Sequence, residues 1–432
     1  MGGFEAIEHS MSQLQDSLGK VKVSPDVIGG SYLMDSNAKP IVSEIRGGWQ
    51  QLLIIGNGFD LECGLRSNYS NFFEPRKNLL YPSYETLDDA GKSWREHIVE
   101  NGITVWDVIL EEYSGSLWND IEKAIALWVL PETKNDSSHF QRLLSLLNPE
   151  MDSDIDPEVR RQFSWRNYAG SKKDDIKEAA VARFILQTCD IKRKNWNTEK
   201  LYSYLRAQLE YLEREFKAFM LRQLDSASTY FDESWKLLSE MISPYYPTEE
   251  NTDTLTTLLN FNYTNPAKNK PAGIPLKAIN VHGKLNGEIV FGIDGKEHMD
   301  NMRVAPFTKT YRLLGLHSDN RFTLFDSVGS LARAGNSIDI IKFYGHSLAE
   351  PDYSYFQAIF DEVDLYSGNT RLVFYFRSHP GSKDAKGEMC KNVSRLLSEY
   401  GQTMNNVDHG KNLMHKLILE GRLSVVELEK SK

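Results

Sequence analysis

Short uncharged apolar runs alternate with amphipathic stretches along this chain. Residues 52–55 are all apolar and end at Gly56, and a run this short is typical of a strand buried on both faces. Further short stretches rich in apolar residues predict strands at 254–261, 277–281, 288–293, 338–344, 371–376 and 423–428. Apolar residues three or four apart instead predict helical structure over 105–130 and an amphipathic helix over 201–224.

Strands separated by helices predict an α/β fold with a Rossmann-like, mostly parallel sheet and a large helical insertion. We expect four segments: a polar extension at 1–45 with a helix over 1–21, a first part of the core with aromatic helices at 46–130, a helical insertion at 131–253, and a second part of the core at 254–432. The polar, mixed-charge stretch at 131–199 indicates exposed loops and shows no motif.

Glycine or polar residues follow four of the expected strands, and these residues are Gly56-Asn57-Gly58, Asn262, His282 and the loop from Gly345 to Asp352. In a doubly wound parallel sheet, ligands bind beyond the carboxyl ends of the strands. We therefore expect these four groups to converge on one crevice.

The glycine turn at 56–58 has two interpretations. A strand, a glycine turn and a helix start form the geometry in which backbone N–H groups and the helix dipole face a phosphate. The same turn also suits a simple connection between two core elements. The dinucleotide fingerprint G-x-G-x-x-G is only partly met, because Leu61 stands at the third glycine position, and this argues against an ordinary dehydrogenase.

Composition narrows the class of protein further. The net charge of −10 argues against a nucleic-acid-binding surface as the main function. Three widely separated cysteines, with no C-x-x-C pair, indicate a reducing compartment and give no metal site. Neither a signal peptide nor an apolar run of 18 residues is apparent, so we expect a cytoplasmic protein that does not enter a membrane.

Four ordered motifs resemble those of the bacterial abortive infection protein AbiH family. They are G-N-G-F-D-L-x-x-G-L-x-S-x-Y-x-x-F at 56–72, N-F-N-Y-T at 260–264, V-H-G-x-L at 281–285 and Y-G-H-S-L-x-E-x-D at 344–352. The resemblance spans 51–376 discontinuously and implies an antiphage effector, which a homo-oligomer or a partner protein of the defence system would restrain until infection. Trp118 to Glu122 is similar to a further W-x-D-[IL]-E element of the family. Asp120 and Glu122 cannot share a helical face, so we expect a structural role for Glu122.

The same motif order is more distantly similar to sirtuin-like NAD-consuming domains. This resemblance implies that Asn262 and His282 are catalytic. It implies nucleotide contacts by Gly56, Asn57, Gly58, Asp60, Gly64, Tyr263, Gly283, Gly345, Ser347 and Asp352. Asn57, Arg66 and Thr264 depart from the sirtuin pattern, which puts the substrate in doubt. The cysteine quartet of the sirtuin zinc module is missing, so no metal and no protein deacylation are implied.

Hydrolysis of the nicotinamide–ribose bond of NAD suits these residue types. The leaving group is neutral, so the site must stabilise an oxocarbenium-like centre, orient a water and hold the ribose hydroxyls. His282 would act as base toward a ribose hydroxyl or water, and Asn262 would orient water and ribose. Asp352 or Ser347 would bind a ribose hydroxyl. A structural histidine near a turn is the alternative for His282, and a loop-shaping role is favoured for His346.

The sequence thus predicts a hydrolase with NAD or a related nucleotide as substrate and no required cofactor. A nucleotide-binding sensor without catalysis is the alternative from another class. A nucleic-acid-cleaving toxin is a third, against which the acidic net charge and the lack of a clustered Asp/Glu metal site argue.

Overall fold

The computed structural model describes residues 50–80, 93–113, 118–133, 136–148, 177–242, 255–296, 298–316, 338–349, 352–379 and 384–429. The chain divides into two units, Met1–Arg46 and Gly47–Lys432, and all described residues belong to the second. The expected N-terminal extension and its helix therefore lie outside the described residues, as does much of the polar stretch expected at 131–199.

Six parallel strands form one sheet. They are β1 (Gln50–Ile55), β4 (Leu255–Asn260), β5 (Leu276–Asn280), β6 (Ile340–Tyr344), β7 (Arg371–Phe376) and β8 (Leu423–Glu427). Their order across the sheet is β5-β4-β1-β6-β7-β8, and every pairing is parallel. In order of appearance this is 3-2-1-4-5-6, the strand order of Rossmann folds, which reverses between β1 and β6. The predicted α/β fold with a Rossmann-like parallel sheet is confirmed.

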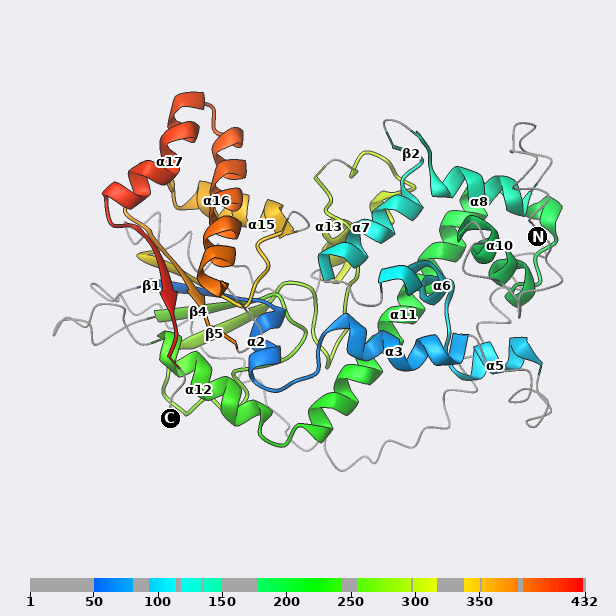
Figure 1. Cartoon of the computed structure of the whole chain (residues 1–432), viewed down its shortest axis with the longest axis horizontal. Coiled ribbons are helices and arrows are strands. Elements are labelled where there is room, and N and C mark those ends of the chain that lie inside the picture. The colour runs from blue at the N-terminus through cyan, green and yellow to red at the C-terminus, as the bar shows by residue number, and fades with distance from the viewer. Residues whose placement is uncertain are drawn as a thin grey trace, which may run out of the picture. The chain divides into compact units, whose positions relative to one another are not determined.

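Both faces of the sheet are covered, which explains its continuous apolar strands. Along β1, Leu52 and Ile54 belong to one hydrophobic core and Leu53 and Ile55 to another. The first core includes buried residues of α15 (Tyr353–Glu362), α16 (Ala385–Thr403) and α17 (Val407–Leu419). The second includes α12 (Tyr230–Ile242), which lies across the sheet from those three helices (Figure 1).

Most of the helices lie between β1 and β4 in the sequence. Besides α12, they are α2 (Asn57–Glu62), α3 (Tyr69–Leu80), α5 (Trp94–Glu100), α6 (Val105–Ile109), α7 (Trp118–Val129), α8 (His139–Leu147), α10 (Lys177–Thr188) and α11 (Thr198–Ser226). A hairpin of β2 (Glu132–Thr133) and β3 (Asp136–Ser137) joins α7 to α8, and α13 (Lys309–Leu316) follows later. The helix expected at 201–224 is thus confirmed within α11. The helical stretch expected at 105–130 consists of α6, a short 3₁₀ helix at Leu110–Tyr113 and α7.

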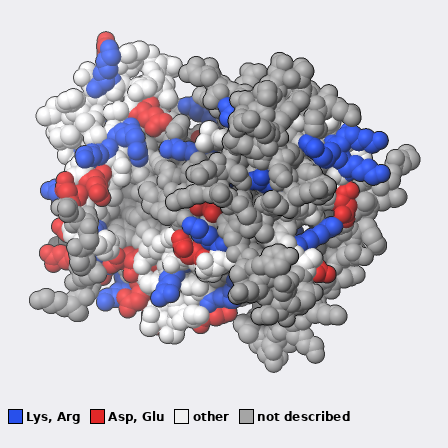
Figure 2. Space-filling model, turned by 45° about the vertical axis from the view of Figure 1, so that its right-hand side comes forward, with Lys and Arg blue, Asp and Glu red and all other residues white. Residues whose placement is uncertain are grey.

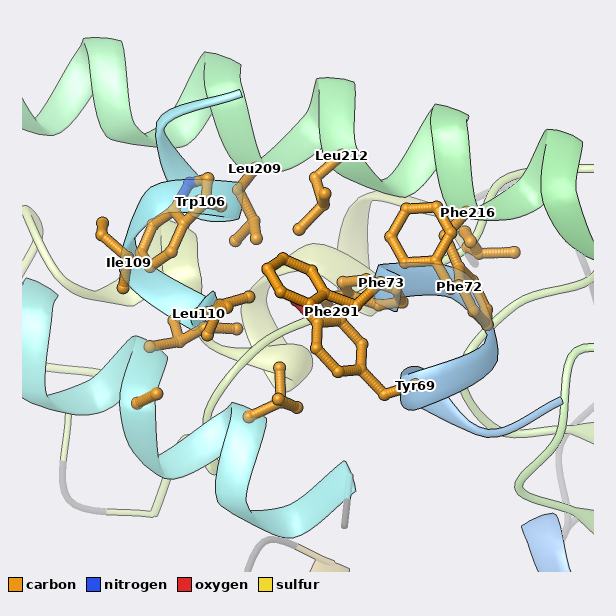
Figure 3. Packing of buried hydrophobic residues seen from close by; sticks show 14 of the residues in the cluster. Tyr69, Phe72, Phe73, Trp106, Ile109, Leu110, Leu209, Leu212, Phe216 and Phe291 are labelled. Atoms are coloured by element: carbon orange, nitrogen blue, oxygen red, sulfur yellow. The ribbon is translucent and has the colours of Figure 1, made fainter. Parts of the chain in front are cut away.

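Aromatic side chains fill the core of this helical region. Phe72 meets Phe216 edge to face with 5.2 Å between ring centroids, and Tyr69 stacks on Phe73 at 5.5 Å (Figure 3). Edge-to-face and offset-stacked rings at these separations add to the burial of apolar surface. In the described part of the chain, we find no helix with the length and apolar character that a membrane crossing requires.

The prediction of a strand at 288–293 is wrong. Residues there make two isolated bridges, Gly283 with Ile289 and Ile293 with Thr308, and pack their apolar side chains into the helical core. The backbone N–H of Phe291 donates to Glu213 of α11 at 2.6 Å, in place of a neighbouring strand. The apolar run at 288–293 therefore reflects packing into the helical core, next to α11.

Candidate functional site

A cleft with a cavity volume of about 330 Å³ opens where β1, β4, β5 and β6 end. Its lining combines residues that the sequence predicted with others that it did not. The predicted ones are Gly56, Asn57, Gly58, Asp60, Asn262, Tyr263, His282, Gly345, Ser347 and Asp352, and the others include Glu122, Lys309, His346, Leu61, Phe216, Met220 and Phe261. Ligand pockets commonly enclose about 300–1,000 Å³, so the volume of this cleft lies at the lower end of the range for ligand pockets.

The glycines at the floor of the cleft bring two loops into contact. Gly58 N–H donates to the carbonyl of Gly345 at 2.8 Å, and Gly56 N–H donates to the carbonyl of Tyr344 at 3.1 Å. Gly345 has a φ of +66°, and a Cβ there would lie 2.3 Å from the nitrogen of Phe59. The close approach of the two loops is therefore sufficient to explain why glycine stands at these positions. Phosphate binding by the turn stays a prediction.

Two predicted glycines lie beside the cleft and are not among its lining residues. Gly64 follows α2, where its N–H donates to the carbonyl of Leu61 at 3.0 Å. Gly283 follows His282 with a φ of +96°, and a Cβ there would lie 2.1 Å from the carbonyl oxygen of Glu288. Both support the loops that carry the lining residues.

Asparagine side chains hold the turn that follows β4. Asn260 Nδ2 donates to the carbonyl of Thr264 at 2.9 Å, and Asn280 Nδ2 donates to the carbonyl of Asn262 at 2.7 Å. The Asn262 amide group in turn donates to the carbonyl of Gly56 at 3.0 Å. This network fixes Asn262 against the glycine turn.

Asp60 is buried beneath the same turn. Its carboxylate accepts hydrogen bonds from the hydroxyls of Tyr230 at 2.6 Å and Thr264 at 3.0 Å. Burial raises the pKa of Asp60 to about 7, although these hydrogen bonds act in the opposite direction. The observed contacts of Asp60 brace the floor of the cleft, and its predicted contact with a nucleotide is not tested by them.

The cleft also holds an ionic cluster, and we call Glu122, Lys309, Asp352, His282 and His346 the cleft cluster. Lys309 Nζ lies 2.8 Å from Asp352 Oδ1 and 2.5 Å from Glu122 Oε1. His282 Nε2 lies 3.1 Å from Asp352 Oδ1, and His346 Nε2 lies 3.3 Å from Asp352 Oδ2. Five side chains thus meet at one point of the cleft: His282 and His346 follow strands β5 and β6, Glu122 and Lys309 belong to α7 and α13, and Asp352 is the N-cap residue of α15.

The hydrogen bonds of the two histidines define their protonation. His346 Nδ1 accepts from the backbone N–H of Leu348 at 2.9 Å, so its Nε2–H faces Asp352. Burial, together with the charge of Lys309, lowers the pKa of His282 to about 3, so this ring is neutral. With its Nε2 proton directed at Asp352, His282 presents a lone pair at Nδ1, and this buried atom has no hydrogen-bond partner among the described residues.

The two carboxylates of the cleft cluster differ in their proton affinity. Burial raises the pKa of Glu122 to about 7 against the opposing charge of Lys309. Burial acts on Asp352 in the same direction, but Lys309 and the hydrogen bond with His346 outweigh it and hold the pKa of Asp352 well below its usual range. A pair of neighbouring carboxyl groups with separated pKa values is typical of sites that perform acid–base chemistry.

Sequence reasoning missed Glu122 and Lys309 as site residues. Glu122 belongs to the W-x-D-[IL]-E element that resembles the AbiH family, and this motif was the one sequence signal that could have indicated Glu122 as a site residue. The side chains of residues 118–120 in the same motif lie outside what the structure describes. Lys309 begins α13 and belongs to none of the motifs. Phe216 and Met220 belong to the amphipathic helix predicted at 201–224, and both also line the cleft.

The fold and this site define the chain as a Rossmann-like α/β protein with a ligand cleft where the strand order reverses. The family model for Bacteriophage abortive infection AbiH matches residues 52–376, which is most of the chain, and the chain belongs to this family. Searches among curated proteins and among solved structures found no match. The resemblance to AbiH proteins is confirmed, whereas the sirtuin-like resemblance gains no support from these comparisons.

Proposed function

We propose that this abortive infection protein hydrolyses the nicotinamide–ribose bond of NAD or of a related nucleotide. The observation that carries the proposal is the unpartnered Nδ1 of His282 in a cleft that also holds Asn262. A buried acceptor without a partner is costly, and a ligand hydroxyl would satisfy it. Dinucleotides bind Rossmann sheets at the reversal of strand order, which is where this cleft lies.

The charge of the cleft cluster suits the same reaction. With both histidines neutral and both carboxylates ionised, Glu122 and Asp352 outnumber the single cation Lys309. The nicotinamide ring of NAD is cationic, and positive charge moves to the ribose as the bond breaks. An excess of negative charge near that ribose would stabilise the transition state.

The remaining residues have roles that follow from their chemistry. His282 Nδ1 would accept the hydrogen bond of a ribose hydroxyl, and Asn262 would orient the attacking water and the ribose. Leu61, Phe216 and Phe261 give the cleft an apolar part in which a flat ring can be buried.

We expect the protein to act in the cytoplasm and to be restrained by a homo-oligomer or a partner protein until infection. A nucleic acid is not the expected ligand. On the face shown in Figure 2, the described Lys and Arg side chains lie in several places beside Asp and Glu side chains, and the net charge of the chain is −10.

The test is to follow NAD and free nicotinamide in incubations of the purified full-length protein, with and without lysate of infected cells as activator. We expect the wild type to consume NAD and release nicotinamide, and His282→Ala and Asn262→Ala to be at least about 100-fold slower. His379→Ala is the control, because His379 is an exposed histidine outside the cleft. NAD binding without turnover, measured by calorimetry, would instead favour the nucleotide-binding sensor, and absence of both would overturn the NAD proposal.

A further inference from the structure

Glu122 enters the cleft from the helical region, on α7, while the other members of the cleft cluster follow β5 and β6 or begin α13. Its side chain is 17% exposed and lines the cleft, whereas that of Lys309 is 3% exposed. Among the described residues, Lys309 is its one hydrogen-bonding and ion-pair partner. Neither of the resemblances found in the sequence gives this carboxylate a role.

We propose that Glu122 is a catalytic residue of this cleft, the general base that removes a proton from the attacking water, and that Lys309 is the positioning residue that holds it there. This inference rests on the proposed hydrolase function and deepens it, because it names the group that activates the nucleophile.

Asp352 is not available for this role. Its Oδ1 contacts both Lys309 and His282, and its Oδ2 contacts His346. A carboxylate that already accepts three charge-assisted or neutral hydrogen bonds is strongly stabilised in its ionised form and is a weak base. Asp352 instead orients the two histidines and Lys309.

His282 is also unsuited to activate water. Its pKa of about 3 makes the imidazole a weak base at neutral pH, although its lone pair can still accept a hydrogen bond. Glu122, with a pKa raised to about 7, matches the pH at which the protein would work. The two residues therefore have different roles in the proposed reaction: His282 holds the ribose and Glu122 activates water.

Atoms and charge balance in the proposed hydrolysis step. The bond between the ribose anomeric carbon and the nicotinamide nitrogen breaks, and its electron pair leaves with neutral nicotinamide. The oxygen of water forms a bond to that carbon while its proton passes to Glu122. Glu122 later releases the proton to solvent, so NAD and water give ADP-ribose, nicotinamide and one proton.

This base must be ionised to act, so kcat/KM should rise with pH through about 7 in the wild type. The charged and titratable groups around Glu122 are Lys309, Asp352, Asp294, His282, His346, Tyr263 and Tyr355. Asp60 also lines the cleft and has a pKa of about 7, so a rise of kcat/KM caused by Asp60 must be distinguished from one caused by Glu122. We expect Glu122→Gln to abolish the rising limb and Asp60→Asn to retain it.

The experiment compares wild type, Glu122→Gln, Glu122→Ala and His282→Ala for NAD turnover, with and without sodium azide. Azide is an anionic nucleophile that needs no deprotonation, and its product is the ribosyl azide. We expect the Glu122 variants to lose about 100- to 10,000-fold in kcat with little change in KM, and azide to restore turnover in Glu122→Ala but not in His282→Ala. Glu199→Gln, an exposed glutamate paired with Arg303, serves as the matched control, and circular dichroism melts confirm folding.

Each of the other possible outcomes overturns a defined part of the two proposals. An active wild type with Glu122→Gln within about threefold of it, or with its rising limb intact, overturns the role of Glu122 and leaves the hydrolase. Folded but inactive Glu122 variants that azide does not rescue overturn the base assignment. A wild type without NAD turnover under every activator overturns both proposals together.

Discussion

Two buried ionic clusters in this protein each pair carboxylates with a cation, and they differ in how completely their polar atoms are hydrogen-bonded. In the helical region, Arg76 of α3 donates from Nε and Nη2 to the two carboxylate oxygens of Asp107 at 2.6 and 2.7 Å, and also to the carbonyl of Gly102. Asp107 accepts two further hydrogen bonds, from the N–H and the hydroxyl of Thr104 at 2.7 and 2.9 Å. Every oxygen of this buried carboxylate therefore has partners.

The cleft cluster also pairs buried carboxylates with a cation, but its hydrogen bonding is incomplete. His282 Nδ1 has no hydrogen-bond partner within the described residues, and the carboxylate of Glu122 remains partly exposed to the cleft. A saturated network makes a structure rigid, whereas an unsaturated one in a cleft is completed by what binds there. Saturation of the hydrogen bonds, more than charge or burial, therefore distinguishes the structural cluster from the candidate site.

The largest expected effect comes from breaking the saturated cluster. Arg76→Met leaves the carboxylate of Asp107, which is fully buried, without its cation. Removing one partner of a buried ion pair costs about 3–5 kcal/mol, so we expect a loss of this size in the free energy of unfolding, measured by urea denaturation.

Lys309→Met is the matched comparison in the cleft cluster. We expect it to cost less, because Glu122 and Asp352 each keep 17% side-chain exposure and Glu122, with its raised pKa, takes up a proton when its cation is removed. An equal or larger loss in Lys309→Met would contradict the distinction between the two clusters.

The sequence could predict the half of the site that depends on topology. Asn262, His282 and Gly345 each follow a short apolar run, and a parallel sheet brings the carboxyl ends of such strands to one edge. A local pattern together with this rule is enough to place them near one another, and the structure places all three in the lining of one cleft.

The other half depends on pairings that leave no local pattern. Glu122 and Lys309 lie far apart in the sequence, and each stands where a solvated charge would be equally ordinary. The prediction of a strand at 288–293 failed for a related reason, because the apolar run from Ile289 to Phe291 is buried against helices. A short apolar run indicates that a segment is buried, but it does not identify the element that buries it.

Asp60→Asn tests a smaller contribution at the floor of the cleft. Folding raises the pKa of Asp60 from 3.8 to about 7, so its stabilising contribution is complete below pH 3.8 and is lost as the pH rises through 7. The variant cannot ionise, and its side-chain oxygen can still accept from Tyr230 and Thr264. Relative to Asp60→Asn, the wild type should therefore lose up to about 4 kcal/mol of unfolding free energy between pH 4 and pH 8.

Urea denaturation at the two pH values measures this difference. Asn269→Ala, an exposed substitution outside the cleft, should show the same stability difference from wild type at both pH values. A difference between wild type and Asp60→Asn that stays constant with pH would show that Asp60 is ionised at no cost, as in a saturated cluster.

The smallest effect is expected at Ser67, whose hydroxyl donates to Asn57 Oδ1 at 2.5 Å in the lining of the cleft. Ser67→Ala removes one hydrogen bond of the kind worth about 0.5–1.5 kcal/mol, and because Asn57 is only half-buried, water can replace the lost donor. We therefore expect a loss near 0.5 kcal/mol in unfolding free energy and a rise of about two- to fivefold in KM for NAD at unchanged kcat, since Asn57 is a predicted nucleotide contact. Ser226→Ala, which removes an exposed hydroxyl outside the cleft, should leave KM unchanged. A large loss of stability in Ser67→Ala would instead show that this side of the cleft is a saturated structural network like that of Arg76 and Asp107.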